Sequence, residues 1–505
     1  MRRIPRLLTV FGAMALCGAA AVPMAAADTG QSPAVEDYGY PGAAQVLADR
    51  GITLLKGDGH ITFVACGGTG LIEVRSTNVP GDHGSDLYHY CFRIDGPVGD
   101  LTLNIPNAYQ VKGDNHDVQA TVTVNDKTST VPVDKNGWTG VGVGAGPDPA
   151  TLLEIKSTGG GSSTPPATDY PYLAKVAVGA PTSANGHGCT GFLVAPRWLA
   201  TAAGCFADDP ASPGTVQAGA PSQASTATFP NGEVATITSL TPRTERDFVL
   251  AQLSRPVTDI AAAPLGVTAP AVGDNLTVVG YGRTASTWAP LQPHAGAYSV
   301  GSVTAVSAGV SASVDTCKGD AGGPALRNGQ VVAISSVSAQ HGCFGSTATA
   351  SGSTEVRTDD LTPWIKQTVG AHAGPVQNGM TLTKCLDAQT LDGKTLTGSM
   401  QVWDCNGGTQ QSWTGVADGQ LHNGLVSTKC LDAQTLDGKT LTGTIQVWDC
   451  NGGSQQLWVL DPASHTLHNG LDSSKCLDAQ TFDGKTLTGT IQVWTCNGGP
   501  QQQWF

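Results

Sequence analysis

A repeat in the last third of the chain restricts the possible folds more than any other feature. The stretch Lys-Cys-Leu-Asp-Ala-Gln-Thr begins at Lys384 and recurs at Lys429 and, as the same seven residues, at Lys475. Each copy continues through glycine-rich turns to a Gln-x-Trp triplet. A unit this short cannot bury its own apolar face, so the three copies must share one core. The sequence therefore predicts a threefold β domain over residues 374–505.

This pattern resembles the ricin-type β-trefoil lectins, in which Gln-x-Trp recurs three times. The resemblance implies that Trp413, Trp458 and Trp504 of the triplets lie in the core. It also implies one sugar site per copy, where a carboxylate and amides bind hydroxyl groups and a second indole stacks on a pyranose ring. The implied site residues are Asp387, Gln401, Trp403 and Gln410 in the first copy, Asp432, Gln446, Trp448 and Gln455 in the second, and Asp478, Gln492, Trp494 and Gln501 in the third.

Each implied site departs from the family at one position, because Gln410, Gln455 and Gln501 stand where asparagine is more usual. Aspartates that only stabilise turns are the alternative interpretation. Where several sites engage one repetitive glycan, avidity exceeds single-site affinity by about 10²–10⁴. The expected partner is therefore a polysaccharide or a clustered surface glycan.

A second informative stretch, residues 317–324, reads Cys-Lys-Gly-Asp-Ala-Gly-Gly-Pro. Two further stretches accompany it, Thr-Ala-Ala-Gly-Cys at 201–205 and Asp-Phe-Val-Leu-Ala-Gln-Leu at 247–253. Together they resemble the trypsin-like serine proteases of the chymotrypsin family. The resemblance covers residues 168–370 and implies two six-stranded antiparallel barrels packed face to face.

The resemblance aligns the catalytic triad with Gly204, Asp247 and Ala321, and the oxyanion hole with the N–H groups of Gly319 and Ala321. Peptide hydrolysis by this route needs a hydroxyl nucleophile and an imidazole that takes its proton. Glycine and alanine supply neither. Losing such a triad costs about 10⁶ in kcat, which would leave about one turnover per day from an ordinary ~10 s⁻¹. We therefore expect a pseudoenzyme, and a serine endopeptidase targeted to glycans by its lectin domain is the alternative.

A further alternative is a decoy that binds protease inhibitors or Arg/Lys-containing peptides. Asp315 aligns with the pocket-floor aspartate of enzymes that select Arg or Lys. Ser338 replaces a glycine of the opposite wall and should narrow the pocket entrance. Asp320 aligns with the aspartate that pairs with a new N-terminus after activation, and the upstream linker offers no such partner.

The N-terminal part of the chain reads as a leader and a β-rich module. Residues 1–27 have the charged start, apolar run and small-residue end of a secretory signal peptide. Residues 28–156 predict a module of unassigned function, with a mobile lead-in, a helix over 41–49 and alternating runs typical of strands. These runs are 60–64, 71–75, 101–105, 118–124 and 130–133. Residues 157–167 are a Gly/Ser/Thr/Pro linker.

Two small polar groups in this module, Asp58 with His60 and Asp114 with His116 and Asp117, are interpreted as solvated turn residues rather than metal ligands. No cofactor and no metal are expected anywhere in the chain. The formal net charge of −13 and the lack of a basic tract argue against nucleic-acid partners. No apolar run after the leader has membrane-spanning length, so no membrane span is expected.

The cysteines predict an extracellular protein with a disulfide framework. Of 13 cysteines, Cys17 lies in the expected leader, and the other twelve fall into local pairs. The pairs are Cys66 with Cys91, Cys189 with Cys205, Cys317 with Cys343, Cys385 with Cys405, Cys430 with Cys450, and Cys476 with Cys496.

Overall fold

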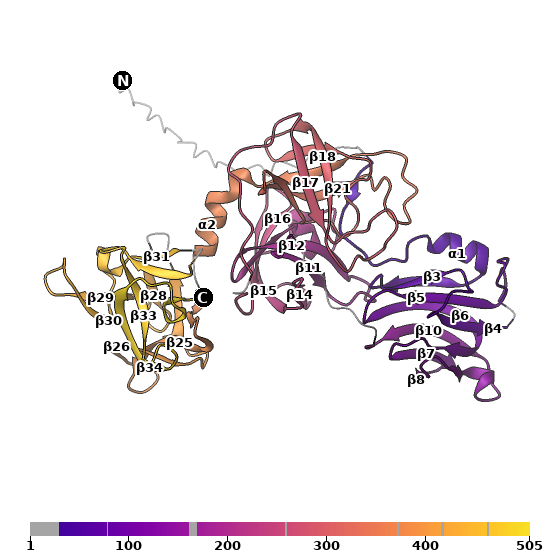
Figure 1. Ribbon diagram of the computed structural model, residues 1–505, viewed down its shortest axis with the longest axis horizontal. Coiled ribbons are helices and arrows are strands. Elements are labelled where there is room, and N and C mark those ends of the chain that lie inside the picture. Colours follow the sequence, from indigo (N-terminus) through magenta and orange to yellow (C-terminus); the bar gives the residue numbers. More distant parts are fainter. Residues whose placement is uncertain are drawn as a thin grey trace, which may run out of the picture.

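The computed structural model describes residues 30–77, 79–160, 169–257, 260–370, 373–415, 419–461 and 464–505. Three domains built from antiparallel strands follow one another along the long axis of the molecule (Figure 1). The expected all-β, multidomain architecture is confirmed. The expected leader, 1–27, lies outside the described residues. Among the helices of the described segments, none is both long and apolar enough to cross a membrane.

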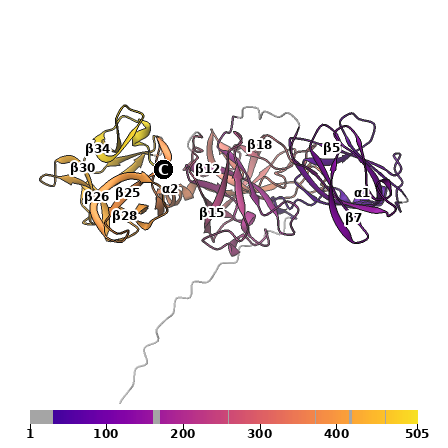
Figure 2. The same ribbon diagram turned by 90° about the horizontal axis from the view of Figure 1, so that it is seen from below.

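The N-terminal module is a nine-stranded antiparallel sheet covered by one short helix. Strand order is β3-β5-β4-β6-β10-β7-β8, with β2 and β9 also paired to the long strand β6. Figure 2 shows β5 and β7 on opposite sides of the module. Its elements are α1 (Ala43–Arg50), β2 (Thr53–Gly57), β3 (Ile61–Val64), β4 (Ile72–Ser76), β5 (His89–Ile94), β6 (Gly99–Lys112), β7 (Val118–Val124), β8 (Lys127–Val133), β9 (Trp138–Gly140) and β10 (Ala150–Ser157).

All five strands expected in this module exist. Four lie within about three residues of the expected bounds, whereas the strand expected at 101–105 is the longer β6, which continues to Lys112. The expectation of a mobile lead-in is wrong, because Ser32–Pro33 forms strand β1 and pairs with β21 of the central domain. The second polar group was also misinterpreted: Asp114 and His116 are buried and hydrogen-bonded to each other at 2.6 Å. Short-range patterns miss such contacts because they arise only when distant segments pack together.

The central domain consists of two six-stranded barrels. The first closes in the order β11-β12-β13-β16-β15-β14, and the second through β21-β20-β17-β18-β19-β22 with β22 paired back to β21. The strands of the first are β11 (Leu173–Val178), β12 (His187–Ala195), β13 (Trp198–Thr201), β14 (Ser225–Thr228), β15 (Val234–Arg243) and β16 (Phe248–Leu253). The second has β17 (Asn275–Gly280), β18 (His294–Val303), β19 (Ser307–Ser311), β20 (Pro324–Arg327), β21 (Gln330–Ser338) and β22 (Ser353–Arg357), and helix α2 (Thr362–Gly370) follows.

The C-terminal domain is a twelve-stranded trefoil. Strands β26, β30 and β34 pair with one another around a threefold axis, through Ser399 with Gln446, Gln401 with Thr490, and Thr444 with Gln492. The strands are β23 (Ala373–Pro375), β24 (Gln377–Asn378), β25 (Thr381–Thr390), β26 (Leu396–Asp404), β27 (Ser412–Gly415), β28 (Leu421–Asn423), β29 (Lys429–Thr435), β30 (Leu441–Asp449), β31 (Trp458–Asp461), β32 (Thr466–Asn469), β33 (Lys475–Thr481) and β34 (Leu487–Thr495).

The trefoil core contains the three tryptophans of the Gln-x-Trp triplets, as expected. Trp413, Trp458 and Trp504 are at most 4% exposed. Each indole N–H donates at 3.0 Å to the backbone carbonyl of a buried leucine 27 residues earlier in the chain. The buried ring thus keeps its polar atom satisfied, which is the usual requirement for tryptophan in a core.

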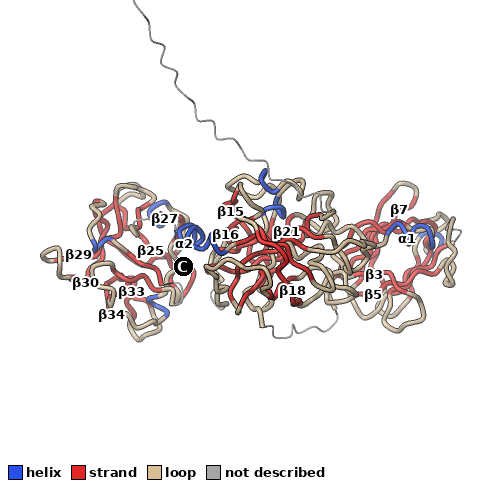
Figure 3. The backbone as a smooth tube through the Cα atoms, turned by 90° about the horizontal axis from the view of Figure 1, so that it is seen from above, coloured by secondary structure: helices blue, strands red, loops and turns tan. Residues whose placement is uncertain are grey.

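The N-terminal module is packed tightly on the central domain. Trp288 of the central domain is buried in the core of the module, with its ring 5.1 Å from the ring of Tyr40. Lys56 of the module donates to the carbonyl oxygens of Ser183 and Ala184. On the other side of the central domain, α2 leads toward the trefoil (Figure 3).

Candidate functional site

The loops that hold the expected triad positions meet where the two barrels join. Gly204 lies in the 3-10 turn Ala203–Phe206, and its N–H donates to Asp247 Oδ1 at 2.7 Å. From the second barrel, Ser336 Oγ donates to Asp247 Oδ2 at 2.7 Å. The loop of Ala321 also reaches this point, because a Cβ added to Gly322 would lie 2.6 Å from the backbone nitrogen of Ala202.

Asp247 is the carboxylate around which these loops assemble. It is buried, and burial raises its pKa, while the bonds from Gly204 and Ser336 oppose that rise. The group in contact with Oδ1 is a backbone N–H rather than an imidazole. The carboxylate therefore joins the two barrels, and neither Gly204 nor Ala321 offers it a side-chain base.

The surroundings of Gly204 leave little space for a larger residue. A Cβ at this position would lie 2.8 Å from the backbone carbonyl oxygen of Pro210, a contact that real Cβ atoms essentially never make. A histidine at position 204 would thus require the neighbouring loop to move.

The two N–H groups expected to form the oxyanion hole converge on one acceptor. The N–H groups of Gly319 and Ala321 both donate to one oxygen, the backbone carbonyl oxygen of Ala34, at 2.7 and 3.1 Å. Gly319 has a φ of 98°, a conformation that favours glycine. The position of Ala321 is fully buried.

Asp320 holds this loop in shape. Its carboxylate accepts N–H bonds from Gly282 and Cys317, each at 2.8 Å, and its Oδ1 lies 3.3 Å from His294 Nε2. Burial alone would lower the pKa of His294, but the nearby Asp320 carboxylate has the larger opposite effect, so the pKa of His294 is raised. A histidine of β18 thus stands beside the carboxylate that the trypsin-like resemblance would pair with a new N-terminus.

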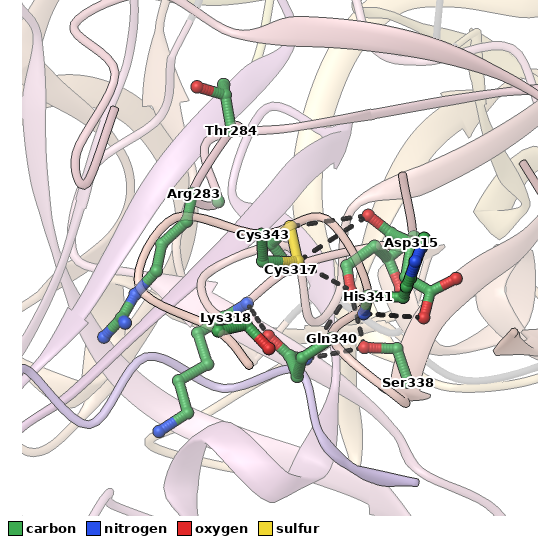
Figure 4. Close-up of a disulfide and its surroundings, with 12 residues drawn as sticks. Arg283, Thr284, Asp315, Cys317, Lys318, Ser338, Gln340, His341 and Cys343 are labelled. Carbon is green, nitrogen blue, oxygen red and sulfur yellow. Dashed lines mark hydrogen bonds between the residues drawn. A yellow bond between two sulfur atoms is a disulfide. The ribbon is translucent and has the colours of Figure 1, made fainter. Parts of the chain in front are cut away.

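Asp315, expected at the floor of a pocket for an Arg or Lys side chain, is 2% exposed. Its two oxygens accept from the backbone N–H groups of His341 and Gly352, at 3.0 and 2.8 Å. Ser338 Oγ donates at 2.5 Å to the carbonyl oxygen of Thr316, the neighbour of Asp315, and Gln340 Nε2 donates to Ser338 Oγ (Figure 4). Hydrogen bonds thus link Ser338 and Gln340 to the segment that carries Asp315.

The expected sugar sites lie on three equivalent hairpins. In the first copy Asp387 of β25 is paired with Gln401 of β26, and Trp403 follows two residues later on the same face. The opposite face, with Leu386 and Val402, is buried in the core. The indoles of the three copies stay exposed, at 54% for Trp403, 53% for Trp448 and 56% for Trp494.

Each site carboxylate is buried and held by amide groups. Asp387 is 3% exposed and accepts from Gln401 Nε2 at 2.9 Å, Gln411 Nε2 at 2.8 Å and Gln410 Nε2 at 3.3 Å. A carboxylate offers about four lone-pair positions, so one remains. Asp432 and Asp478 repeat the arrangement with Gln446, Gln455 and Gln456, and with Gln492, Gln501 and Gln502.

The structure adds residues that sequence reasoning missed. Gln411, Gln456 and Gln502, the first residues of the triplets, are fully buried and orient the site carboxylates. The triplet itself was the available signal, but only its tryptophan was interpreted. The third copy also differs, because Lys475 donates to Thr495 where Lys384 and Lys429 form ion pairs with Asp404 and Asp449.

All six expected disulfides are present. Three clusters combine one histidine with two cysteines, for example His89 with Cys66 and Cys91. Their sulfurs are bonded to each other, so they do not offer the thiolates that a zinc site uses. Six disulfides indicate an oxidising compartment.

A cavity of about 500 Å³ lies between the central domain and the trefoil, lined by residues such as Trp198, Gln420 and Leu460. None of the expected sugar-binding residues lines it, and neither do the residues of the cleft between the barrels. Its size alone does not make it a functional site, and the candidate sugar-binding and cleft residues lie elsewhere.

Comparison with known proteins identifies both domains. Residues 159–365 match the family described as Trypsin, and residues 372–504 match the ricin-type beta-trefoil lectin domain. Gussurobin, a snake venom serine protease of Gloydius ussuriensis, is 30% identical over 206 residues, which span 36% of this chain and 78% of gussurobin. Haly-2, a snake venom serine protease of Gloydius brevicauda, is 28% identical over 180 residues, 30% of this chain and 67% of Haly-2.

Among solved structures, neuropsin, a serine protease expressed in mouse brain, aligns over 40% of this chain and 95% of its own, with 18% identity and a TM-score of 0.32. The family match and the 30% identity to gussurobin, of which the chain covers 78%, show that the chain belongs to the trypsin family of serine proteases, and it carries a ricin-type β-trefoil lectin domain at residues 372–504.

Proposed function

We propose that this is a secreted carbohydrate-binding protein whose trypsin-like domain does not hydrolyse peptides. The observation that supports sugar binding most strongly is the threefold set of exposed indoles, each beside a carboxylate held by amides. Indole that is half exposed and rigidly placed offers a flat apolar face to the C–H face of a pyranose ring. The buried carboxylate and the neighbouring amides supply hydrogen-bond partners for its hydroxyl groups.

A repetitive glycan suits this arrangement better than a free monosaccharide. Three related sites on one rigid domain can engage several sugar units of one polymer, and the gain in avidity is about 10²–10⁴ where the spacing fits. The third site differs from the other two, because Thr495 stands beside Lys475 where the other copies have an aspartate. The ligand class is thus a polysaccharide or a dense surface glycan.

The decisive experiment is a pull-down of the full-length protein on a panel of insoluble plant, fungal and bacterial polysaccharides and on glycan arrays. The triple variant of Trp403→Ala, Trp448→Ala and Trp494→Ala should lose the avidity gain, a fall of about 10²–10⁴ in apparent affinity. Leu436→Ala is the matched control, because Leu436 is 79% exposed on the same domain but lies at a hairpin tip. Equal binding by the wild-type protein and the triple variant would overturn the proposal.

The proposed inactivity rests on the residues at the centre of the cleft. Gly204 has no side chain and its N–H contacts Asp247, and Ala321 has no hydroxyl. A fluorophosphonate probe reacts only with an activated serine, so we expect no labelling of this protein under conditions that label trypsin. Labelling at any serine would instead favour the alternative, a serine endopeptidase directed to glycans.

A further inference from the structure

Residues 31–36, here called the cleft segment, lie in the cleft of the trypsin-like domain. The carbonyl oxygen of Ala34 accepts from both N–H groups of the oxyanion hole, Gly319 and Ala321. In a serine protease these groups bind the oxygen of the carbonyl that is attacked. The Ala34–Val35 peptide bond therefore occupies the place of a bond about to be cut, and the residue facing it, Ala321, cannot attack.

The backbone of the cleft segment is held on both sides of that bond. Before it, β1 pairs with β21 in antiparallel register, and Ala34 N–H donates to the carbonyl oxygen of Ser336 at 2.8 Å. After it, Glu36 and Gly188 exchange two backbone hydrogen bonds, each at 2.8 Å. The segment thus adds a short strand to the second barrel and a bridge to the first, which is recognition of an extended peptide by strand addition. In Figure 1 the indigo N-terminal chain runs from its module to the side of β21.

The side chains of the segment are recognised as well. The Gln31 amide donates to Gly352 O at 3.0 Å and accepts from Thr354 Oγ1 at 2.8 Å. Glu36 forms a two-bond ion pair with Arg283, at 2.6 and 2.7 Å, and both side chains are buried. Burying the Arg283 guanidinium without an opposite charge beside it is costly. This contact is therefore specific to an acidic residue.

The burial of Ala34 explains which residue stands at the centre. Ala34 is 0% exposed, so its methyl group is fully enclosed by its neighbours. A long or aromatic side chain at this position would have to displace them. The site therefore favours a small residue here.

We propose that the cleft of the trypsin-like domain is a peptide-binding site whose ligand is the chain's own cleft segment. The site takes an extended peptide with a glutamine at the start, a small residue at the position of Ala34 and an acidic residue two positions after it. Its role is to bind the N-terminal module to the domain rather than to process a substrate. This assignment does not depend on sugar binding.

Hydrogen–deuterium exchange of the full-length protein tests the site directly. The amides of Ala34, Glu36, Gly319 and Ala321 should exchange at least 10²-fold more slowly than in an unstructured chain, because each donates within the site. Unprotected amides at residues 34 and 36 of the wild-type protein would overturn the assignment, without any variant being needed.

The variant Ala34→Trp places an indole where only a methyl group fits, and it should increase exchange at these four amides by tenfold or more. Ser32→Trp is the matched control, because Ser32 is exposed and should tolerate the same side chain. A labelled synthetic peptide of residues 31–37 should then bind the Ala34→Trp protein and not the wild-type protein, whose site is filled. Equal binding to both proteins, or unchanged exchange in Ala34→Trp, would show that the cleft does not select this segment.

Discussion

Glu355 gives the sharpest test of how the cleft wall is built. It is fully buried in the second barrel and is paired with Ser335 of β21, whose Oγ donates to Glu355 Oε2 at 3.0 Å. Its other oxygen has no hydrogen-bond partner among the described residues. Burial, with a contribution from Asp320, raises the pKa of Glu355 from 4.5 to about 8. The carboxyl group is therefore protonated in the folded protein at neutral pH.

The size of the effect follows from this shift. Between pH 4.5 and pH 8 the folded state keeps a proton that the unfolded state has lost, so the free energy of unfolding falls as pH rises. The shift from 4.5 to about 8 corresponds to about 5 kcal/mol over this interval. The stabilising contribution is complete below pH 4.5 and is lost as pH rises through 8. Glu355→Gln keeps the shape and removes the titration.

The assay is thermal unfolding of wild-type protein and Glu355→Gln at intervals from pH 4.5 to pH 8. The Tm of the variant minus the Tm of the wild-type protein should rise by roughly 10–20 °C from pH 4.5 to pH 8, because each kcal/mol corresponds to about 2–4 °C. Glu245→Gln is the control, because the pKa of Glu245 is lowered and its contribution is constant above pH 4.5. A Tm difference that is the same at every pH would refute the buried, protonated Glu355.

Three further outcomes are expected. Gly204→Ala should destabilise the domain by about 1–3 kcal/mol, since the new Cβ meets a backbone carbonyl of the 207–212 loop, and the loss is read from urea unfolding. His294→Gln should lose stability relative to the wild type most strongly below pH 6.5. The raised pKa of His294 stabilises the folded state at low pH, and this contribution is lost as the pH rises through that pKa. Equal losses of stability at pH 5 and pH 9 would contradict this. Arg283→Met should cost about 3–5 kcal/mol by leaving the buried Glu36 carboxylate without its counter-charge, although the Tyr38 N–H still donates to it, and adding Glu36→Gln should recover part of the loss.

The sequence was sufficient for the trefoil and for the two barrels because their signals are local or repeated. Trp413 and its two equivalents could be assigned to the core from a triplet that occurs three times. The disulfides followed from cysteines at most 26 residues apart. Asp387 could be expected in a sugar site, but its amide partner Gln411 could not be distinguished from an ordinary turn residue.

The cleft was harder to predict because its decisive contacts are between residues far apart in sequence. Residues 31–36 contain no pattern of apolar alternation, and a short polar stretch near a leader reads as a mobile segment. Its strand pairing depends on β21, about 300 residues later. The hydrogen bond from Gln340 to Ser338 likewise forms only in the folded domain. The sequence led us to expect that Ser338 narrows the pocket entrance, but not that residues 31–36 occupy the cleft.

The distance along the chain between the cleft segment and its site has a consequence for assembly. Gln31 contacts Gly352 across 321 positions. Closing a flexible loop of that length costs about 5 kcal/mol in chain entropy. The segment is synthesised before the barrels, and its site exists only after both barrels have formed. The segment therefore stays unbound and exposed to solvent until the barrels have folded.

The N-terminal module changes this cost. Once it has packed around Trp288, the residues that follow the segment are already fixed next to the cleft. The remaining search is that of a short tether, for which the effective concentration is in the millimolar range. A segment with only weak intrinsic affinity then stays bound, and a free peptide at micromolar concentration cannot displace it.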